Sequence, residues 1–301
     1  MKKFEENLKK KFDKSVHFNH SLKNYNWFNL GGPAEIFFKP NNKDQLSEFL
    51  KIIHKEQLPI FTLGAGSNIL IRDKGIKGVT IKLGKEFSFL EKIDDENINI
   101  GGNVQDKKIS DFATLNSIAG LEYLSCVPGT VGGSTIMNSG CYGNEICENI
   151  VSINAMDFSG NEITLKNKEI KFSYRNSDIS NLIITSVKLK GKKSKKDEIK
   201  KKQLNLISKK KLSQPNRIKT CGSTFKNSGN YKAWELIKKT NSHLFKVGNA
   251  SISDKHCNFF INEGNATSME IENLIDKVKS NVKKQTGILM DLEIKMIGEK
   301  I

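Results

Sequence analysis

Residues 126–143 read C-V-P-G-T-V-G-G-S-T-I-M-N-S-G-C-Y-G, with five glycines and one proline among eighteen residues. Glycine costs a helix about 1 kcal/mol and proline about 3 kcal/mol, so we expect no regular helix in this stretch. Glycine lets a backbone approach a ligand closely, and successive bare N–H groups form a concavity that binds anions. The stretch therefore predicts a loop around a large phosphorylated cofactor, with a tight turn between packed strands as the alternative.

A second glycine-containing stretch, G-A-G-S-N-I-L-I at residues 64–71, follows an apolar strand pattern at 60–63. It resembles a dinucleotide-binding fingerprint, but the third glycine is absent and a β-like run replaces the helix start. We therefore expect a loop between two strands, in which Ser67 and Asn68 offer donors to a diphosphate. The sequence contains no G-x-x-x-x-G-K-[ST] motif, which argues against a P-loop nucleotidase.

Length and composition favour a globular protein of two domains, or of one large domain with an appendage. The chain has 301 residues, of which 37% are hydrophobic. No apolar run approaches the ~20 residues of a membrane helix, and the lysine-rich N-terminus lacks the apolar segment of a secretory signal. We expect a cytoplasmic protein without membrane insertion. Five cysteines without a C-x-x-C pair predict reduced thiols and no metal site.

The formal charge of +16 raises the alternative of a lysine-rich nucleic-acid-binding protein. Only Arg72, Arg175 and Arg217 are arginines, and the lysines are dispersed without an aromatic-basic RNA motif. We interpret these lysines as solvated faces. Binding to nucleic acid is expected to be weak, nonspecific and salt-sensitive.

Hydrophobic periodicity predicts strands and helices along the first 190 residues. Residues 1–20 are expected to be a polar lead-in with one short helix. A helix capped by Asn42 is followed by Pro59, and a helix from about 106 to 117 has Gly120 as its stop. The predicted strands cover 36–38, 60–63, 78–83, 97–101, 150–158, 162–165 and 182–189, the hairpin being 150–158 with 162–165.

The C-terminal region differs in character. A charged run at 191–202 opens a helix to about residue 212 and marks a domain boundary. Residues 221–225 predict a turn into a strand, and 232–239 a short helix. A capping box at Thr267 begins a helix that Gly287 stops. The last strand alternates, with Leu292, Ile294 and Met296 on one face and Asp291, Glu293 and Lys295 on the other.

Five motifs in a fixed order carry a resemblance to a known family. They are G-A-G-S-N-I-L-I, V-P-G-T-V-G-G-S-T-I-M-N-S-G-C-Y-G, Y-R-N-S, C-G-S-T-F-K-N and L-E-I-K-M-I-G-E. Over roughly residues 24–300 the chain resembles the UDP-N-acetylenolpyruvoylglucosamine reductases, flavoenzymes that make UDP-N-acetylmuramate for peptidoglycan. Because no long insertion follows Tyr174, it looks like the shorter type II form. Lys295 and Trp27 depart from the family's usual arginine and threonine.

The resemblance implies an α+β protein with a two-subdomain FAD-binding fold of the vanillyl-alcohol-oxidase (PCMH) type and a C-terminal α+β substrate domain. The expected segments are a lead-in at 1–23, the FAD-binding domain at 24–190 split near 84, the charged connecting helix at 191–212 and the substrate domain at 213–301. It also implies noncovalent FAD and NADPH as hydride donor. The partner is a UDP-sugar enolpyruvyl ether, and we expect a monomer.

In the implied reaction, NADPH reduces the flavin, which delivers hydride to C3 of the enol ether, and a proton then reaches C2. Ser223 corresponds to the proton donor, Arg175 to the arginine at the substrate carboxylate, and Glu293 to the active-site glutamate. The alternatives without a catalytic role are a structural serine at Ser223, a surface ion pair at Arg175, and a solvent-exposed Glu293. A lysine among 209–211 is a further candidate for the diphosphate.

The remaining expected contacts follow the same motifs. Those with the cofactor come from Gly64, Ala65, Gly66, Ser67, Asn68, Ile69, Pro128, Gly129, Gly132, Gly133, Asn138, Gly140, Tyr142 and Gly143. Tyr174 and Asn227 are expected to contact the substrate. Another FAD-dependent oxidoreductase of the same fold would share the glycine loops but lack the set of Ser223, Arg175 and Glu293.

Overall fold

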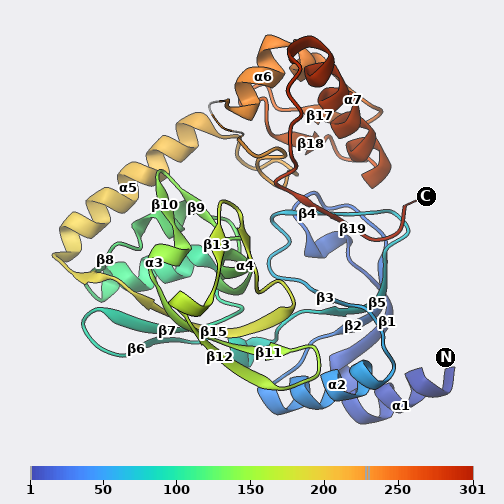
Figure 1. Cartoon of the computed structure of the whole chain (residues 1–301), viewed down its shortest axis with the longest axis vertical. Coiled ribbons are helices and arrows are strands. Elements are labelled where there is room, and N and C mark those ends of the chain that lie inside the picture. Colours follow the sequence, from blue (N-terminus) through green and yellow to red (C-terminus); the bar gives the residue numbers. More distant parts are fainter. Residues whose placement is uncertain (1, 228, 230, 301) are drawn as a thin grey trace. The chain divides into compact units, whose positions relative to one another are not determined.

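The computed structural model describes residues 2–227, 229 and 231–300 of the chain (Figure 1). The chain forms two compact units, and both are built from segments that are not consecutive. The first unit comprises Met1–Phe18, Ile36–Ala65 and Gly78–Lys210, and the second comprises Asn19–Glu35, Gly66–Lys77 and Lys211–Ile301. The predicted loop at 64–69 is therefore divided between the two units.

A four-stranded sheet with the order β1-β2-β5-β3 packs against two helices. The strands are β1 (Val16–Ser21), β2 (Pro33–Phe38), β3 (Ile60–Thr62) and β5 (Ile76–Ile81), and the helices are α1 (Lys2–Phe12) and α2 (Lys43–Lys55). The rings of Phe38 and Phe49 stack with centroids 3.6 Å apart, and Phe12 meets both edge-on. Asn42 accepts a hydrogen bond from the Gln45 amide at 2.8 Å, so the predicted start of α2 is confirmed.

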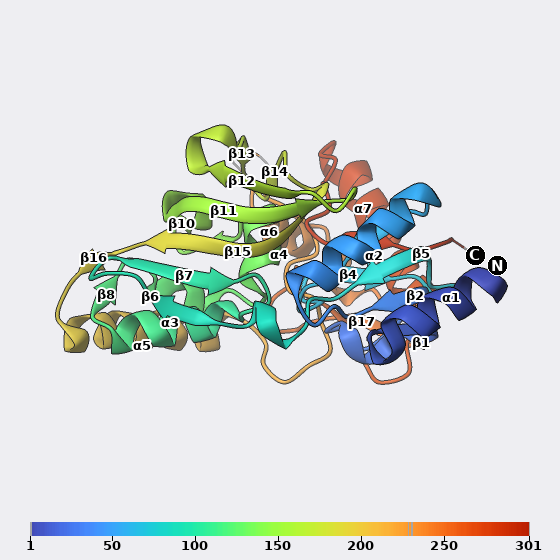
Figure 2. The ribbon, with the colours of Figure 1, turned by 90° about the horizontal axis from the view of Figure 1, so that it is seen from below.

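A five-stranded antiparallel sheet with the order β12-β11-β15-β7-β6 forms the rest of the first unit's framework. Its strands are β6 (Leu90–Lys92), β7 (Asn97–Gly101), β11 (Ile150–Asp157), β12 (Glu162–Lys166) and β15 (Leu182–Lys190). The hairpin of β11 and β12 confirms the prediction. Three helices belong to this region: α3 (Asp106–Leu115), α4 (Val131–Ile136) and α5 (Lys196–Ser213). Figure 2 shows α3 and α5 on the same side of the sheet.

The glycine-rich stretch contains a helix that was not expected, since α4 occupies its middle. Val131 is fully buried, and a Cβ on Gly132 would come within 2.9 Å of the Gly102 carbonyl oxygen. The helix packs against β15 and β7 at a distance that only a glycine allows. Tertiary packing therefore outweighs the low helix propensity of glycine.

Three further boundaries differ from the predictions. The lead-in contains a strand, β1, as well as α1, because Val16 is buried in the core of the four-stranded sheet. Helix α3 ends at Leu115, before the predicted stop at Gly120, because Ser117 already has a left-handed φ of 61°. Helix α5 begins at Lys196, since the two preceding lysines of β16 (Lys192–Lys193) pair with β8 (Ile118–Ala119).

The second unit has its own core around the predicted C-terminal helix. Helix α7 (Ser268–Thr286) buries Ile271, Leu274 and Val278, and its capping box at Thr267 and its left-handed Gly287 are confirmed. Its other elements are α6 (Ala233–Lys239), the antiparallel pair β17 (Ala250–Ile252) and β18 (Phe260–Asn262), and the parallel pair β4 (Ile69–Ile71) and β19 (Lys295–Ile297).

Short elements complete the described chain. The remaining strands are β9 (Gly140–Cys141), β10 (Asn144–Glu145), β13 (Phe172–Ser173) and β14 (Asn176–Ser177). The 3-10 turns are η1 (Asp13–Ser15), η2 (Lys23–Tyr25), η3 (Lys85–Phe87), η4 (Glu122–Cys126), η5 (Ile146–Glu148), η6 (Asn167–Glu169) and η7 (Ser242–Leu244). Residues 221–225, predicted as a turn into a strand, contribute only isolated bridges.

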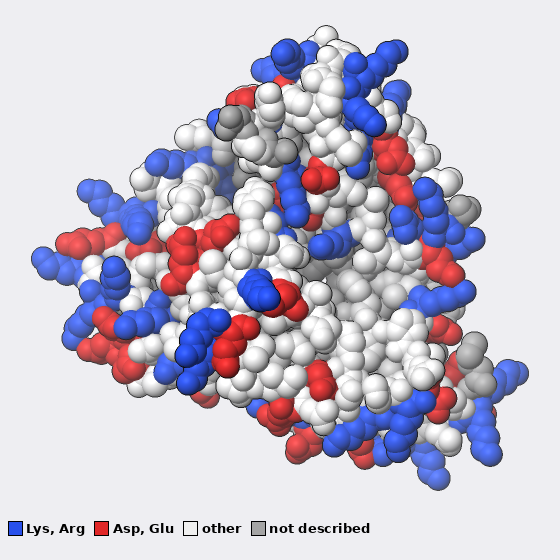
Figure 3. All heavy atoms as spheres, viewed as in Figure 1, with Lys and Arg blue, Asp and Glu red and all other residues white. Residues whose placement is uncertain are grey.

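The surface view shows how the charged side chains are distributed. On the face drawn in Figure 3, lysines and arginines are interspersed with aspartates and glutamates rather than gathered in one stripe. Within the described residues, no helix combines the length and the apolar character needed to cross a bilayer. The same residues contain no cluster of three or more histidines, cysteines or carboxylates that could hold a metal ion.

Candidate active site

The predicted site residues fall into both units. The first unit holds Gly64, Ala65, Pro128, Gly129, Gly132, Gly133, Asn138, Gly140, Tyr142, Gly143, Tyr174 and Arg175. The second unit holds Gly66, Ser67, Asn68, Ile69, Ser223, Asn227 and Glu293. Each unit therefore holds its own group of predicted site residues.

Arg175 lies at the tip of the β13–β14 hairpin, with a left-handed φ of 57°. Its Nη2 donates to the Gly140 carbonyl oxygen at 3.0 Å, and its Nη1 lies 3.9 Å from a carboxylate oxygen of Glu145. The guanidinium carbon lies 4.8 Å from the centroid of the Tyr174 ring, in a cation–π contact. The arginine side chain is 17% exposed. These contacts fix the direction of a planar fork that suits a carboxylate.

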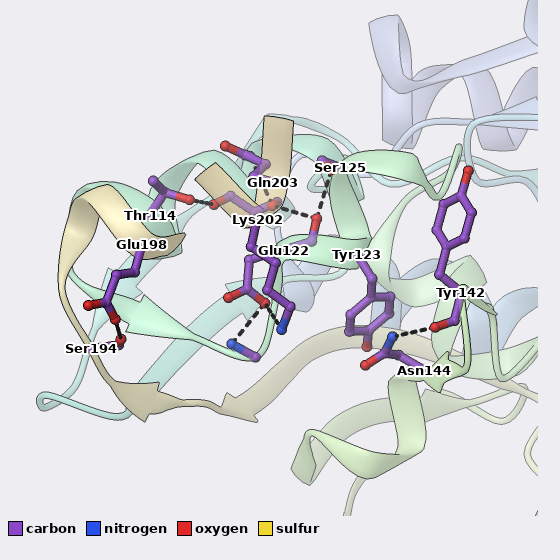
Figure 4. A network of polar contacts seen from close by, with 12 residues as sticks. Thr114, Glu122, Tyr123, Ser125, Tyr142, Asn144, Ser194, Glu198, Lys202 and Gln203 are labelled. Carbon is purple, nitrogen blue, oxygen red and sulfur yellow. Dashed lines mark hydrogen bonds and ion pairs between the residues drawn. The ribbon is translucent and has the colours of Figure 1, made fainter. Parts of the chain in front are cut away.

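The end of the glycine-rich stretch is a tight hairpin of β9 and β10. A Cβ on Gly140 would lie 1.9 Å from the Asn144 carbonyl oxygen, so this glycine has a packing reason. Tyr142 occupies the turn with φ 53°, and Asn144 Nδ2 donates to its carbonyl at 3.1 Å (Figure 4). A Cβ on Gly143 would meet nothing within 4 Å. Glycine is therefore favoured at position 143 by its left-handed φ of 81°, and not by lack of space for a side chain.

The two glycine stretches meet inside the first unit. A Cβ added to Gly64 would lie 2.8 Å from the Thr130 hydroxyl oxygen, which precedes α4. Lys82 Nζ donates to the Gly64 carbonyl at 2.5 Å, and burial lowers the pKa of this lysine. Sequence reasoning missed Lys82, because it is one lysine among many. The glycine at 64 and the segment around 130 can therefore line a single ligand.

Helix α5 braces the start of the same stretch. Lys202 Nζ lies 3.3 Å from the buried Glu122, whose Oε2 also accepts the Gly120 amide at 3.0 Å (Figure 4). Farther along α5, Lys210 Nζ donates to the Cys126 carbonyl at 2.9 Å, and burial lowers its pKa. Lys210, one of the lysines considered for the diphosphate, is therefore attached to the glycine-rich stretch.

The buried carboxyl of Asp106 is hydrogen-bonded to α4. Asp106 is fully buried at the start of α3, and its Oδ2 accepts a hydrogen bond from the Ser134 hydroxyl at 2.6 Å. Its Oδ1 has no hydrogen-bond partner among the described residues. Desolvation raises the pKa of Asp106 to about 7, against the opposing hydrogen bond from Ser134. This pair ties the glycine-rich stretch to the five-stranded sheet region.

In the second unit, main-chain bonds bring Ser223 and Glu293 together. Ser223 forms an isolated bridge with Phe259, after Gly222 with φ 77°. The next residue, Thr224, accepts a hydrogen bond from the Glu293 amide at 2.8 Å. The predicted proton donor and the predicted glutamate therefore lie on adjacent backbone segments. Glu293 precedes β19, so the regular strand is shorter than predicted.

The loop around Asn68 joins this group. Asn68 Nδ2 donates to the Glu293 carbonyl at 3.0 Å, and the Asn68 carbonyl accepts the Lys295 amide at 2.9 Å. A Cβ on Gly66 would lie 2.1 Å from the Tyr25 carbonyl oxygen, so this glycine also has a packing reason. Asn68 is thus placed beside Glu293 in the same unit.

Two asparagines of the second unit support the backbone. One, Asn227, was expected to contact the substrate, and the other, Asn258, was not expected to have a role. Asn227 Oδ1 accepts the Ala233 amide at 3.1 Å, so this oxygen supports the start of α6. Asn258 is buried and exchanges two hydrogen bonds with the Phe225 main chain, at 2.8 and 2.9 Å. It fixes the strand-like segment that carries Ser223. No pattern in the sequence singles Asn258 out.

Two family models match the chain. The C-terminal domain of UDP-N-acetylenolpyruvoylglucosamine reductase matches residues 214–297, and an FAD binding domain matches residues 34–166. The UDP-N-acetylenolpyruvoylglucosamine reductase of Rickettsia canadensis is 43% identical over 284 residues, 94% of this chain and 95% of that protein. The same-named protein of Pelagibacter ubique is 43% identical over 286 residues, 94% of each chain.

A solved structure shares the fold. The UDP-N-acetylenolpyruvylglucosamine reductase of Thermus caldophilus superimposes with a TM-score of 0.80 at 27% identity, covering 94% of this chain and 98% of that one. The match to an FAD binding domain and this shared architecture confirm the predicted fold class. The chain belongs to the UDP-N-acetylenolpyruvoylglucosamine reductase family.

Proposed function

We propose that this chain reduces UDP-N-acetylenolpyruvoylglucosamine to UDP-N-acetylmuramate, a peptidoglycan precursor, with FAD as cofactor and NADPH as hydride donor. The observation that carries the proposal is the main-chain hydrogen bond from the Glu293 amide to the Thr224 carbonyl, which holds the segments of Ser223 and Glu293 side by side. An FAD-dependent oxidase with other substrates would have no use for this pair. The reaction belongs in the cytoplasm, where NADPH and nucleotide sugars are available.

The glycine stretches of the first unit fit FAD. At Gly64 the backbone lies so close to Thr130 that a side chain would fill the space. The predicted contacts from Pro128 to Gly133 belong to the same stretch. When bound, FAD would supply the hydride transfer between NADPH and C3 of the enolpyruvyl group. No histidine or cysteine has a specific claim as an attachment site, so the cofactor is noncovalent.

Ser223 donates the proton that C2 requires. A serine hydroxyl is a weak acid, but an enolate-like carbon is basic enough to take its proton when the hydroxyl is held in place. The bridge to Phe259 and the neighbouring Thr224–Glu293 bond restrict the position of Ser223. Glu293 supplies charge and orientation beside it.

Arg175 binds the substrate carboxylate. Before C2 is protonated, negative charge spreads from C2 into this carboxylate, and a fixed guanidinium stabilises that charge. Lysine would offer a point charge without the planar fork. Tyr174, stacked on the arginine and 45% exposed, is the adjacent substrate contact.

The test uses the purified protein without oxygen. NADPH should bleach the yellow flavin, and the enolpyruvyl sugar nucleotide should restore the colour and yield UDP-N-acetylmuramate, identified by mass. UDP-N-acetylglucosamine is the control, because it lacks the enol ether and should restore nothing. A protein without flavin, or a bleached flavin that the enolpyruvyl substrate leaves unchanged, would refute the proposal.

A further inference from the structure

A ring of hydrogen bonds and one ion pair surrounds Arg175 in the first unit. One oxygen of Glu145 accepts a hydrogen bond from Asn138 Nδ2 at 2.7 Å, and its other oxygen lies 3.9 Å from Arg175 Nη1. Asn138 Nδ2 also donates to the Ser173 carbonyl at 3.1 Å, two residues before Arg175. The chain of contacts therefore starts and ends on the hairpin that carries the arginine.

We propose that Glu145 is the positioning residue for Arg175, holding the guanidinium in the direction that receives the substrate carboxylate. This inference rests on the proposed function. Nothing in the sequence distinguished Glu145, although it stands two residues after Gly143. It acts through Arg175 and does not itself contact the substrate.

The distance of 3.9 Å between Arg175 Nη1 and Glu145 Oε1 indicates how the carboxylate acts on the guanidinium. A guanidinium that is only 17% exposed benefits from a nearby negative charge, because an uncompensated ion shielded from water is costly. A short, two-bond pair with Glu145 would instead occupy the fork that a substrate carboxylate uses. Glu145 makes its short hydrogen bond with Asn138 and lies 3.9 Å from Arg175, so it compensates the charge of the guanidinium without forming such a two-bond pair.

The backbone supports the same reading. Asn138 and Arg175 both have left-handed φ angles, 42° and 57°, a conformation that asparagine tolerates but that an arginine rarely adopts unless its surroundings impose it. Asn138 is 1% exposed, and its Oδ1 accepts the Cys147 amide at 3.3 Å, so its amide plane is fixed from both ends. Its two Nδ2 bonds leave the side chain of Asn138 committed to this ring rather than to a cofactor.

The experiment compares Glu145→Gln with Glu148→Gln, a control that removes the same charge at an exposed position three residues away. Glutamine keeps an acceptor for Asn138 but loses the charge facing Arg175. We expect flavin content and flavin reduction by NADPH to stay within about twofold of wild type, and reoxidation by the enolpyruvyl substrate to slow ~10-fold. The control should match wild type in every measurement.

A second pair of variants separates positioning from folding. In an Arg175→Lys background the fork is already lost, so adding Glu145→Gln should change reoxidation less than twofold. An equal ~10-fold loss in both backgrounds, or a matching loss in flavin reduction, would overturn the inference. Unchanged reoxidation in Glu145→Gln would overturn it as well. Failure of the proposed function is distinguishable, because then wild type itself would not be reoxidised.

Discussion

Arg175 in the first unit and Ser223 in the second unit are held in different ways. Besides the Gly140 carbonyl, side chains surround the arginine: Glu145 faces its guanidinium, and Asn138 ties Glu145 to the same hairpin. Around Ser223 the contacts are mainly between backbone groups, such as the bridge to Phe259 and the bond between Thr224 and Glu293. Carbonyl and amide groups do not titrate, whereas carboxylates do. The surroundings of Arg175 should therefore respond to changes of charge, and those of Ser223 to changes of hydrogen-bond geometry.

In the first unit, the largest effect is expected from Arg175→Ala. Removing a preorganised donor of charge stabilisation typically costs ~10²–10³-fold in rate, and we expect that loss in flavin reoxidation by the enolpyruvyl substrate. Flavin reduction by NADPH should keep its rate, because it does not involve the substrate carboxylate. Stopped-flow absorbance measures both steps, with the exposed Arg217→Ala as control. Equal losses in both steps would show that Arg175 supports the flavin site itself.

The second prediction concerns Asp106→Asn and the pH dependence of stability. The folded protein raises the pKa of Asp106 from 3.8 to about 7, so it binds the proton more tightly than the unfolded chain does. Stability from this group is therefore present at low pH and is lost as pH rises towards about 7. Asparagine can still accept the Ser134 bond but cannot ionise.

Urea unfolding of both proteins at low and high pH tests this difference. Between about pH 5 and pH 8, the free energy of unfolding of Asp106→Asn relative to wild type should rise by about 3 kcal/mol. A difference that stays constant with pH would mean that Asp106 keeps an ordinary pKa. The support that Asp106 gives to α4 would then not depend on pH near neutrality.

The smallest effect is expected from Asn68→Ala in the second unit. It removes the hydrogen bond from Asn68 Nδ2 to the Glu293 carbonyl, while the Thr224–Glu293 bond remains. A single hydrogen bond contributes about 1 kcal/mol, so reoxidation should slow by at most ~10-fold. Stopped-flow reoxidation measures this loss. A loss as large as that of Arg175→Ala would show that side chains, not the backbone, hold Glu293.

Some features were predictable from sequence because each depends on a local signal. Asn42 and Thr267 cap their helices through their own hydroxyl or amide oxygens, and Gly287 ends α7 through a left-handed φ. Arg175, Ser223 and Glu293 were proposed because their motifs occur in the family's order, and their roles remain proposals. Short-range chemistry thus accounts for the boundaries that were confirmed.

Other features depend on distant neighbours and could not be predicted. Helix α4 forms where glycines argue against it, because its Gly132 fits closely against the Gly102 carbonyl. Glu145 and Asn258 have no distinguishing pattern, since each acts on a residue thirty or more positions away, Arg175 and Phe225 respectively. The division of residues 64–69 between two units likewise depends on packing rather than on the residues of the loop.

Ser223→Ala, studied in both half-reactions, tests the central claim most directly. Flavin reduction by NADPH requires no proton at C2 of the substrate, so its rate should remain near that of wild type. Reoxidation by the enolpyruvyl substrate requires that proton, and a positioned general acid contributes ~10²–10⁴-fold, so this step should slow by that factor. If Ser223→Ala slows reduction as much as reoxidation, Ser223 supports the fold or the flavin rather than delivering a proton.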